Sequence, residues 1–297
     1  MKIAIFGRLT ENTNIHSLTT FFRYLAENNL PFLIYHLYYE QLMEKFPAEM
    51  CAFEMATFSS PKDLGGVKFL YSFGGDGTVL ECVRMMGNAP NPIPIMGVNF
   101  GRLGYLTTVS QYEAIEATQA LLRDSYRIDE RGLLSIISEP AGIFGDKNFG
   151  LNDLTLHKSS NNEMITVHVY VNGEFLNSYK GDGLIIATPT GSTAYSLACG
   201  GPIIFPTSEN FIITPVAPHS LTVRPVVISD TCVISCEVES RSGEAMLALD
   251  TRTEIIKAGT SIAIRKADFR AKLVRMLDSK YIDTLRKTLM WGVDARK

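Results

Sequence analysis

Hydrophobic residues in the first 125 positions occur in short runs that alternate with segments of helical spacing. The runs that predict buried strands are Lys2–Phe6, Pro31–Leu37, Val67–Phe73 and Ile93–Asn99. The helical segments lie near residues 15–28, 77–86 and 111–124. Strands that alternate with helices in this way are typical of a parallel sheet with crossover helices. The pattern therefore predicts an α/β domain over residues 1–125.

The pattern changes near residue 126, where short runs rich in Val, Ile, Thr and Tyr replace the helical spacing. The runs that predict strands here are Thr166–Val171, Phe175–Tyr179, Gly183–Thr188, Val226–Val238, Ala245–Leu249 and Ser261–Arg265. Asn172-Gly173 separates the first two runs, and Asn-Gly between strands is a strong hairpin signal. We expect a mostly β, sandwich-like domain over residues 126–278, followed by a helical C-terminal segment over about 279–297 whose clearest helical spacing is Ser279–Met290.

The composition is that of a folded protein with about two domains. The chain has 297 residues, of which 46% are hydrophobic and 20% charged. Its 28 Lys and Arg against 31 Asp and Glu give a formal net charge of −3, which argues against nucleic acid or an anionic membrane as a partner. No apolar run is long enough to span a bilayer, and the apolar run at the N-terminus is too short for a secretory signal. We therefore expect a cytoplasmic protein.

The cysteines and histidines show no metal-ligand spacing. The five cysteines are Cys51, Cys82, Cys199, Cys232 and Cys236, and they include no CxxC pair. The sequence therefore predicts neither a disulfide framework nor a zinc site, and no residue is assigned as a direct metal ligand.

The segment Phe73-Gly74-Gly75-Asp76-Gly77-Thr78 follows a predicted strand and precedes a predicted helix. Glycines allow positive φ angles and let a ligand approach the main chain, and the N–H groups at a helix start attract phosphate. We therefore expect Gly74, Gly75 and Thr78 to form a phosphate-binding turn. Asp76 adds negative charge there, so it needs a purpose such as accepting a proton from a hydroxyl or holding a metal. Taken alone, Gly-Gly-Asp-Gly is also ordinary turn chemistry.

A second glycine-rich region surrounds a predicted strand in the other half of the chain. Lys180-Gly181-Asp182-Gly183 begins this strand, and Pro189-Thr190-Gly191-Ser192-Thr193-Ala194-Tyr195-Ser196 follows it. Ser192 or Thr193 is expected to cap the next helix, whose N–H groups would bind an anion or a base edge, and Tyr195 supplies a flat face and a hydroxyl. The alternative is that Ser192 and Thr193 only cap the helix and that Tyr195 only packs in the core. Two such turns, one in each half, favour a nucleotide that both halves bind.

A third segment places an amide beside a carboxylate at the start of a predicted strand. Asn152 and Asp153 lie in Phe149-Gly150-Leu151-Asn152-Asp153-Leu154. An amide donates and accepts and a carboxylate accepts strongly, so this pair suits the two hydroxyls of a ribose. Alone, such a pair is more often a plain turn before a strand.

These segments, taken in order and with Asn99-Phe100-Gly101-Arg102-Leu103-Gly104-Tyr105-Leu106 between them, resemble the NAD kinase family over most of the chain. Gly-Gly-Asp-Gly is shared with the diacylglycerol kinase and 6-phosphofructokinase families, whereas Thr188-Pro-Thr-Gly-Ser-Thr-Ala-Tyr195 is far more specific. The resemblance implies an N-terminal α/β domain, a C-terminal β-rich domain and a terminal helix that returns to the first domain.

The resemblance also implies an activity. The family transfers the γ-phosphoryl group of ATP, or of another donor, to the 2′-hydroxyl of the adenosine ribose of NAD, giving NADP. A divalent cation, usually magnesium, is required, and members are usually homodimers or homotetramers. The sequence distinguishes neither the preferred donor, nor acceptance of NADH, nor feedback by the product.

Site residues follow from the same resemblance. Asp76 would accept the proton of the 2′-hydroxyl or orient that hydroxyl, and Gly77 would lie beside the nucleotide. The residues expected to bind substrate are Asn152, Asp153, Lys180, Asp182, Thr193, Ala194, Tyr195, Ser196, Ala198, Ala217 and Arg252. Lys180 stands where some members have Arg, which would give a point-charge contact. Asp250-Thr251-Arg252 replaces the Asp-Gly-Gln of many members, which leaves the role of Arg252 open.

Two other functions are compatible with parts of the sequence. A lipid or sugar kinase would share Gly74–Thr78, but it would not explain Thr188–Tyr195. A nucleotide-binding sensor without phosphoryl transfer would keep both turns, but it would have no need of a carboxylate at position 76.

Overall fold

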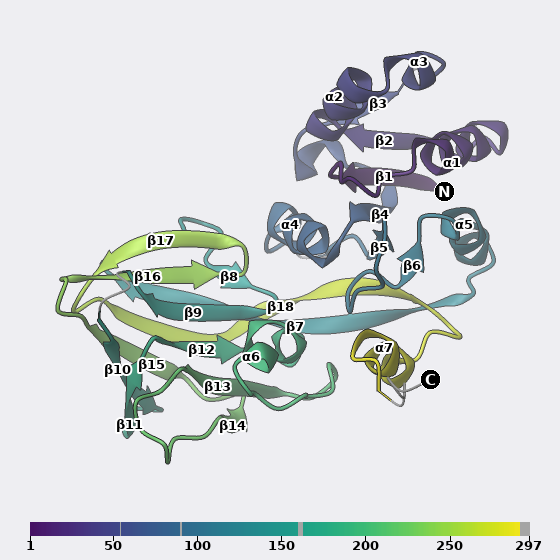
Figure 1. The fold of residues 1–297 in the computed structure, drawn as a ribbon. Coiled ribbons are helices and arrows are strands. Elements are labelled where there is room, and N and C mark those ends of the chain that lie inside the picture. Colours follow the sequence, from purple (N-terminus) through teal and green to yellow (C-terminus); the bar gives the residue numbers. More distant parts are fainter. Residues whose placement is uncertain (54, 90, 160–162, 292–297) are drawn as a thin grey trace. The chain divides into compact units, whose positions relative to one another are not determined.

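The computed structural model describes residues 1–53, 55–89, 91–159 and 163–291, and it divides into two compact units (Figure 1). The first unit comprises Met1–Asp129 and the C-terminal segment that begins at Lys272, and the second comprises Glu130–Ala271. The expected C-terminal helical segment included residues 292–297, which lie outside the described residues.

A parallel sheet with strand order β5-β4-β1-β2-β3 forms the centre of the first unit. Its strands are β1 (Lys2–Gly7), β2 (Phe32–Tyr35), β3 (Ala56–Phe58), β4 (Val67–Gly74) and β5 (Ile95–Asn99). The short strand β6 (Val109–Ser110) and Leu273 of β18 (Ser261–Met276) also pair with β5 in parallel. The helical elements are α1 (Ile15–Glu27), α2 (His36–Lys45), α3 (Pro47–Met50), η1 (Pro61–Asp63), α4 (Asp76–Met86), α5 (Ala114–Leu122) and α7 (Tyr281–Thr288). The expected α/β architecture is confirmed.

The strand order reverses beside β1, which has β2 on one side and β4 on the other. In parallel α/β sheets, ligands bind outside the carboxyl ends of the strands at such a reversal. Because β4 ends at Gly74, the glycine-rich turn that follows it lies at this carboxyl edge. The topology therefore places the turn where this class of fold binds ligands.

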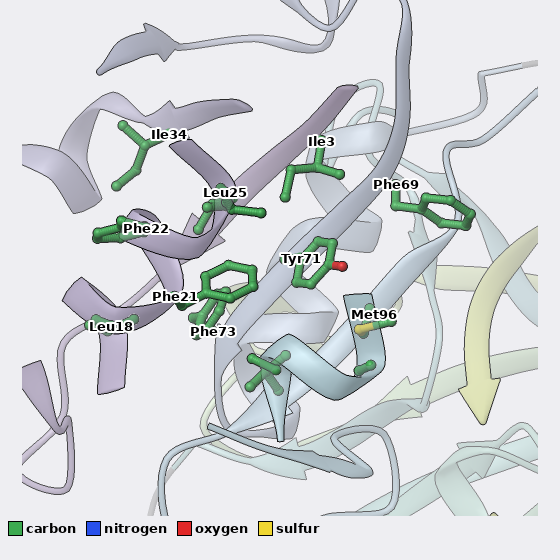
Figure 2. Packing of buried hydrophobic residues seen from close by; sticks show 14 of the residues in the cluster. Ile3, Leu18, Phe21, Phe22, Leu25, Ile34, Phe69, Tyr71, Phe73 and Met96 are labelled. Atoms are coloured by element: carbon green, nitrogen blue, oxygen red, sulfur yellow. The ribbon is translucent and has the colours of Figure 1, made fainter. Parts of the chain in front are cut away.

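Aromatic packing fixes the strand from which that turn emerges (Figure 2). The ring centroid of Phe21 on α1 lies 5.6 Å from that of Tyr71 and 5.5 Å from that of Phe73, both on β4. The Tyr71 hydroxyl shares a hydrogen bond of 2.8 Å with the Thr118 hydroxyl on α5. Burial of one such apolar side chain stabilises the fold by about 1.5–3 kcal/mol. The carboxyl end of β4 is therefore a rigid platform.

The second unit is a sandwich of two antiparallel layers. One layer has the order β14-β13-β12-β9-β16-β17, and the other contains β11-β10-β15-β18. The strands of the first layer are β9 (Asp153–Lys158), β12 (Gly183–Ala187), β13 (Asn210–Val216), β14 (Val226–Ser229), β16 (Glu244–Leu249) and β17 (Arg252–Lys257). The remaining elements are β7 (Tyr126–Glu139), which begins in the first unit, β8 (Phe149–Gly150), β10 (Ile165–Val171), β11 (Glu174–Gly181), β15 (Ile234–Glu239), η2 (Gly191–Thr193) and α6 (Tyr195–Ala198). One buried apolar cluster contains residues of both layers, such as Leu156 and Val167.

Some expected elements match closely and others differ for identifiable reasons. The hairpin at Asn172-Gly173 is confirmed, since both residues have positive φ angles, 51° and 84°. The strand expected over Pro31–Leu37 ends at Tyr35, because the next residues start α2 and bury side chains at helical spacing. The strand expected over Val226–Val238 is interrupted by a turn after Ser229, so it forms β14 and β15. Strands β7, β13 and β17 were not expected.

No helix among the described residues is long and apolar enough to cross a membrane.

Candidate functional site

The turn from β4 into α4 is open on the side of its exposed glycines. Gly75 precedes the helix and Gly77 is its second residue, and a Cβ added at either position would meet nothing within 4 Å. Gly74 is different, because an added Cβ would overlap the Thr78 side chain. The turn thus combines exposed main chain at the start of an eleven-residue helix with a tightly packed base. This arrangement suits an anion that approaches the helix N–H groups.

The Asp76 carboxylate is held by a loop about thirty residues further along the chain. Its Oδ2 accepts a hydrogen bond from the Tyr105 N–H at 2.8 Å. Its Oδ1 accepts three, from the Leu106 N–H at 3.1 Å and from the Thr107 N–H and hydroxyl at 2.9 Å each. Among the described residues Oδ2 therefore has a single donor, and a carboxylate oxygen carries two lone pairs. One lone pair of Oδ2 is therefore left without a donor in the described structure.

Gly104 makes this close approach possible. An added Cβ would overlap the Asp76 carboxylate and would lie 2.5 Å from the Thr107 hydroxyl. This role of Gly104 could not be predicted from the sequence, because the Asp76–loop contact joins two segments far apart in the chain.

In the second unit, Asp250 holds the segment that contains the expected ribose-binding pair. Its Oδ1 accepts hydrogen bonds from the Asn152 N–H at 2.8 Å and the Asp153 N–H at 3.2 Å, and its Oδ2 accepts one from the Leu151 N–H at 2.8 Å. Asp153 is 7% exposed, and burial, together with the negative charge of Asp250, raises its pKa to about 7. Burial also raises the pKa of Asp250, although the three N–H groups and Arg252 oppose that rise.

The turn after β12 packs on the same segment. The Thr188 N–H donates to the Asn152 carbonyl at 2.8 Å, and the Thr188 hydroxyl donates to the Leu151 carbonyl at 2.6 Å. Gly191 is required here because an added Cβ would overlap the Asn152 carbonyl. The structure therefore brings together the second and third sequence motifs.

The expectation that Ser192 or Thr193 caps a helix is wrong. The helix α6 has only four residues, its N-cap is Ala194, and no side chain caps it. The Ser192 hydroxyl instead donates to the Pro189 carbonyl at 2.7 Å, and the Thr193 hydroxyl donates to the Thr190 carbonyl at 3.2 Å. Both hydroxyls therefore stabilise the turn itself.

Asp182 and Tyr195 lie on the same side of this unit as Asp153. Asp182 forms an ion pair of 2.8 Å with Lys158. Tyr195 is 42% exposed, and its pKa is raised by burial, then by Cys199, Asp182 and Asp153. The negative charges of both carboxyl groups thus act on the Tyr195 hydroxyl.

Comparison with known proteins decides the family. The family described as the ATP-NAD kinase N-terminal domain matches residues 3–126, and the ATP-NAD kinase C-terminal domain matches residues 151–276. The chain belongs to the NAD kinase family. It is 42% identical to the NAD kinase of Cytophaga hutchinsonii over 296 residues and 39% identical to that of Flavobacterium psychrophilum over 298 residues, with 100% of both chains covered in each case.

Solved structures of NAD kinases and NADH kinases share this fold. A yeast NADH kinase complexed with NADH superposes with a TM-score of 0.85 at 21% identity, covering 99% of this chain and 89% of the other. An NAD kinase from Archaeoglobus fulgidus in complex with ATP gives a TM-score of 0.71 at 24% identity, covering 97% and 99%. The α/β and mostly β architecture is therefore that of the NAD kinase family.

The remaining residues expected from the NAD kinase resemblance differ in their surroundings. Ser196 is buried, and its hydroxyl shares a hydrogen bond of 2.8 Å with that of Thr214. Lys180, Ala198 and Ala217 are exposed. Ala217 has a φ of 42°, an uncommon conformation for a residue with a side chain and one that clusters at ligand sites.

Arg252 serves the structure of the second unit. Its guanidinium donates to the carbonyls of Lys147 and Phe149 and lies 5.0 Å from the ring centroid of Phe144. These contacts hold the segment that leads into β8. They explain how an arginine is accommodated where many NAD kinases have a glutamine.

Among the described residues, no group of three or more His, Cys, Asp or Glu side chains could hold a metal ion. Magnesium commonly keeps several waters and is bound by one or two carboxylates together with substrate phosphates. The single carboxylate of Asp76 beside an open helix start fits that mode.

A cavity of about 690 Å³ in the first unit is separate from the glycine-rich turn. Its lining includes Glu116 on α5, Asp283 and Lys287 on α7, and Leu277 between β18 and α7. None of the expected site residues lines it.

Proposed function

We propose that the chain transfers the γ-phosphoryl group of ATP to the 2′-hydroxyl of the adenosine ribose of NAD, giving NADP and ADP. The observation that carries this proposal is the Asp76 carboxylate, which is fixed by four hydrogen bonds at the first residue of α4 and retains a lone pair on Oδ2. Family membership over the full chain supports the same reaction.

The proposed step needs little covalent chemistry from the protein. The 2′-oxygen forms a bond to the γ-phosphorus while the bond from that phosphorus to the bridging oxygen breaks, and ADP leaves with the bonding pair. The hydroxyl proton passes to Asp76 Oδ2. Phosphoryl transfer depends mainly on in-line positioning and charge stabilisation, so orienting the hydroxyl is as important as accepting its proton.

The open turn and the helix start explain how the donor would be bound. The exposed N–H side of Gly75 and Gly77 would face phosphate oxygens, and the positive end of the α4 dipole would favour their charge. A divalent cation, magnesium by preference, would be held beside the Asp76 carboxylate and would supply positive charge that neutralises the phosphates.

NAD would bind to the second unit through the residues gathered around Asp153. Asn152 and Asp153 would orient ribose hydroxyls, and Asp182 and the Thr193–Ala198 segment would complete the surface. The fixed amides of Leu151 to Asp153 support this role, because they hold the main chain that carries both side chains.

We also propose a homodimer or homotetramer in the cytoplasm. Apolar side chains exposed on strands at the borders of both layers of the second unit, Phe175 at 60% and Ile255 at 59%, favour assembly. All five cysteines are free, as expected in a reducing compartment. Light scattering of the purified protein measures the assembly directly, and a monomer at micromolar concentration would contradict it.

The activity is tested by incubating the purified protein with NAD, ATP and magnesium and following NADP with an NADP-specific dehydrogenase. Omission of ATP and chelation of the metal should each abolish NADP formation, and Asp76→Asn should lower its rate by about 100-fold or more. Asp63→Asn is the matched control, because Asp63 also accepts backbone hydrogen bonds in the first unit but caps η1. Binding of NAD without turnover under all donor conditions would instead indicate a sensor.

A further inference from the structure

A buried arginine contacts the loop that holds Asp76. Arg275 lies near the end of β18 and is 4% exposed. Its Nη2 donates to the Tyr105 carbonyl at 3.0 Å, and its Nη1 donates to the Leu106 carbonyl at 3.2 Å and to the Thr108 hydroxyl at 3.0 Å. Asp129 lies 3.6 Å from its Nε and balances its charge.

Two peptide groups therefore lie between a guanidinium and a carboxylate. The peptide that joins Tyr105 to Leu106 accepts from Arg275 through its carbonyl and donates to Asp76 through its N–H. The peptide that joins Leu106 to Thr107 does the same. Because a peptide group is planar, fixing the direction of its carbonyl also fixes the direction of its N–H.

Electrostatics strengthens this arrangement. A cation at the carbonyl end of a peptide polarises the group, which makes its N–H a better donor, and hydrogen bonds in series reinforce one another. The rigid fork of a guanidinium reaches two carbonyls at once, which an ammonium group does with less geometric constraint. Arg275 is thus coupled to Asp76 although the two side chains share no hydrogen bond in the described structure.

We propose that Arg275 is a positioning residue for Asp76. By fixing the peptide groups between Tyr105 and Thr107, it directs the N–H groups of Leu106 and Thr107 at Oδ1 and leaves Oδ2 turned toward the reacting hydroxyl. This inference rests on the proposed kinase activity and deepens it, since it assigns the orientation of the acceptor carboxylate to a residue from the far end of the chain.

The test is a double-mutant cycle with Arg275→Met and Asp76→Ala, in which kcat, the KM for NAD and the melting temperature are all measured. Arg275→Met should lower kcat by about 30-fold, because small misplacement of a reacting group costs up to about 100-fold. The KM for NAD should change less than about threefold, since the substrate contacts are retained. In the Asp76→Ala background the same substitution should lower kcat less than about twofold, because its partner is gone.

Arg127→Met is the matched control. Arg127 also donates to a backbone carbonyl in the first unit, that of Ser279 at 2.7 Å, but it forms no hydrogen bond with the loop in the part of the chain that the structure describes. Its removal should leave kcat unchanged. Arg275→Lys keeps the buried charge and should recover part of the lost kcat. If Arg275→Met does not fold, Arg275→Lys replaces it in the double-mutant cycle.

The outcomes separate the two proposals. If Arg275→Met or Arg275→Lys lowers the melting temperature but leaves kcat unchanged, or lowers kcat equally with and without Asp76, Arg275 is only structural and the inference is overturned. If Asp76→Ala retains full NADP formation, the proposed role of Asp76 fails whatever Arg275 does.

Discussion

Replacing Asp76 by asparagine should destabilise the first unit as well as lower turnover by about 100-fold or more. The substitution is usually chosen because it preserves shape while removing the charge. Here the carboxylate accepts four hydrogen bonds, three of them from consecutive main-chain N–H groups. An amide oxygen in the place of Oδ1 could keep three of these, but its nitrogen would then face the Tyr105 N–H.

The structure gives the size of the effect. The donor of Tyr105 would lose its acceptor, which costs about 1–3 kcal/mol for a buried group. The three retained bonds would change from a charged to a neutral acceptor, and charge-assisted bonds are roughly twice as strong as neutral ones, so about 1 kcal/mol is lost from each. Allowing for the partial exposure of Asp76, a loss of about 4 kcal/mol in the free energy of unfolding is expected, which corresponds to a fall of about 12 °C in melting temperature.

The fluorescence of Trp291 can be used to measure the stability of the first unit. It is the single tryptophan of the chain, and it belongs to the unit that contains Asp76. Urea unfolding followed by its fluorescence gives the free energy of that unit for the native protein, Asp76→Asn and the control Asp63→Asn. A difference below about 0.5 kcal/mol between Asp76→Asn and the native protein, the size of an ordinary surface substitution, would refute the reasoning.

Three further predictions concern Asp153, Gly104 and Thr107. NAD affinity, measured by calorimetry, should rise up to about tenfold between pH 6 and pH 8, because the pKa of Asp153 is raised to about 7 and its carboxyl group accepts hydrogen bonds from NAD fully only when ionised. Asp250→Asn removes a negative charge that raises this pKa, so the midpoint of the pH dependence should move to lower pH. Gly104→Ala should lower kcat more than about tenfold while Gly65→Ala, at a position with open space, leaves it unchanged; equal activities would contradict the steric argument. Thr107→Val removes one of the four bonds to Asp76, so denaturation should show a loss of about 1 kcal/mol with the carboxylate still in place.

The sequence predicted the parts of the fold that depend on local patterns. The alternation of apolar runs located the parallel sheet, and Asn172-Gly173 located a hairpin because its turn type needs two residues that tolerate positive φ. The boundary at Tyr35 was missed because one apolar run continues from a strand into a helix, and periodicity cannot divide such a run.

The sequence predicted the candidate site residues but not the groups that hold them in place. Asp76 and Asp153 were found because they lie in short motifs. Their partners were not, because Asp76 is held by main-chain groups about thirty residues away and Asp153 lies on a segment held by Asp250, nearly one hundred residues away. Every residue except proline carries a backbone N–H, so residue type does not indicate which N–H groups bind a side chain, and only the folded structure shows it. Arg275 was missed for the same reason, since two of its acceptors are carbonyls.

The use of main-chain groups to hold Asp76 has a consequence for how this loop can change through evolution. Every residue except proline supplies the N–H that positions 105 and 106 contribute. Substitutions at these two positions are limited by packing alone, and no other position needs to change in order to keep the hydrogen bonds to Asp76. The strict requirements fall instead on Gly104, where no Cβ fits, and on Thr107, whose hydroxyl is the one side-chain donor. Paired substitutions between position 76 and this loop would therefore be rare, although four hydrogen bonds join them.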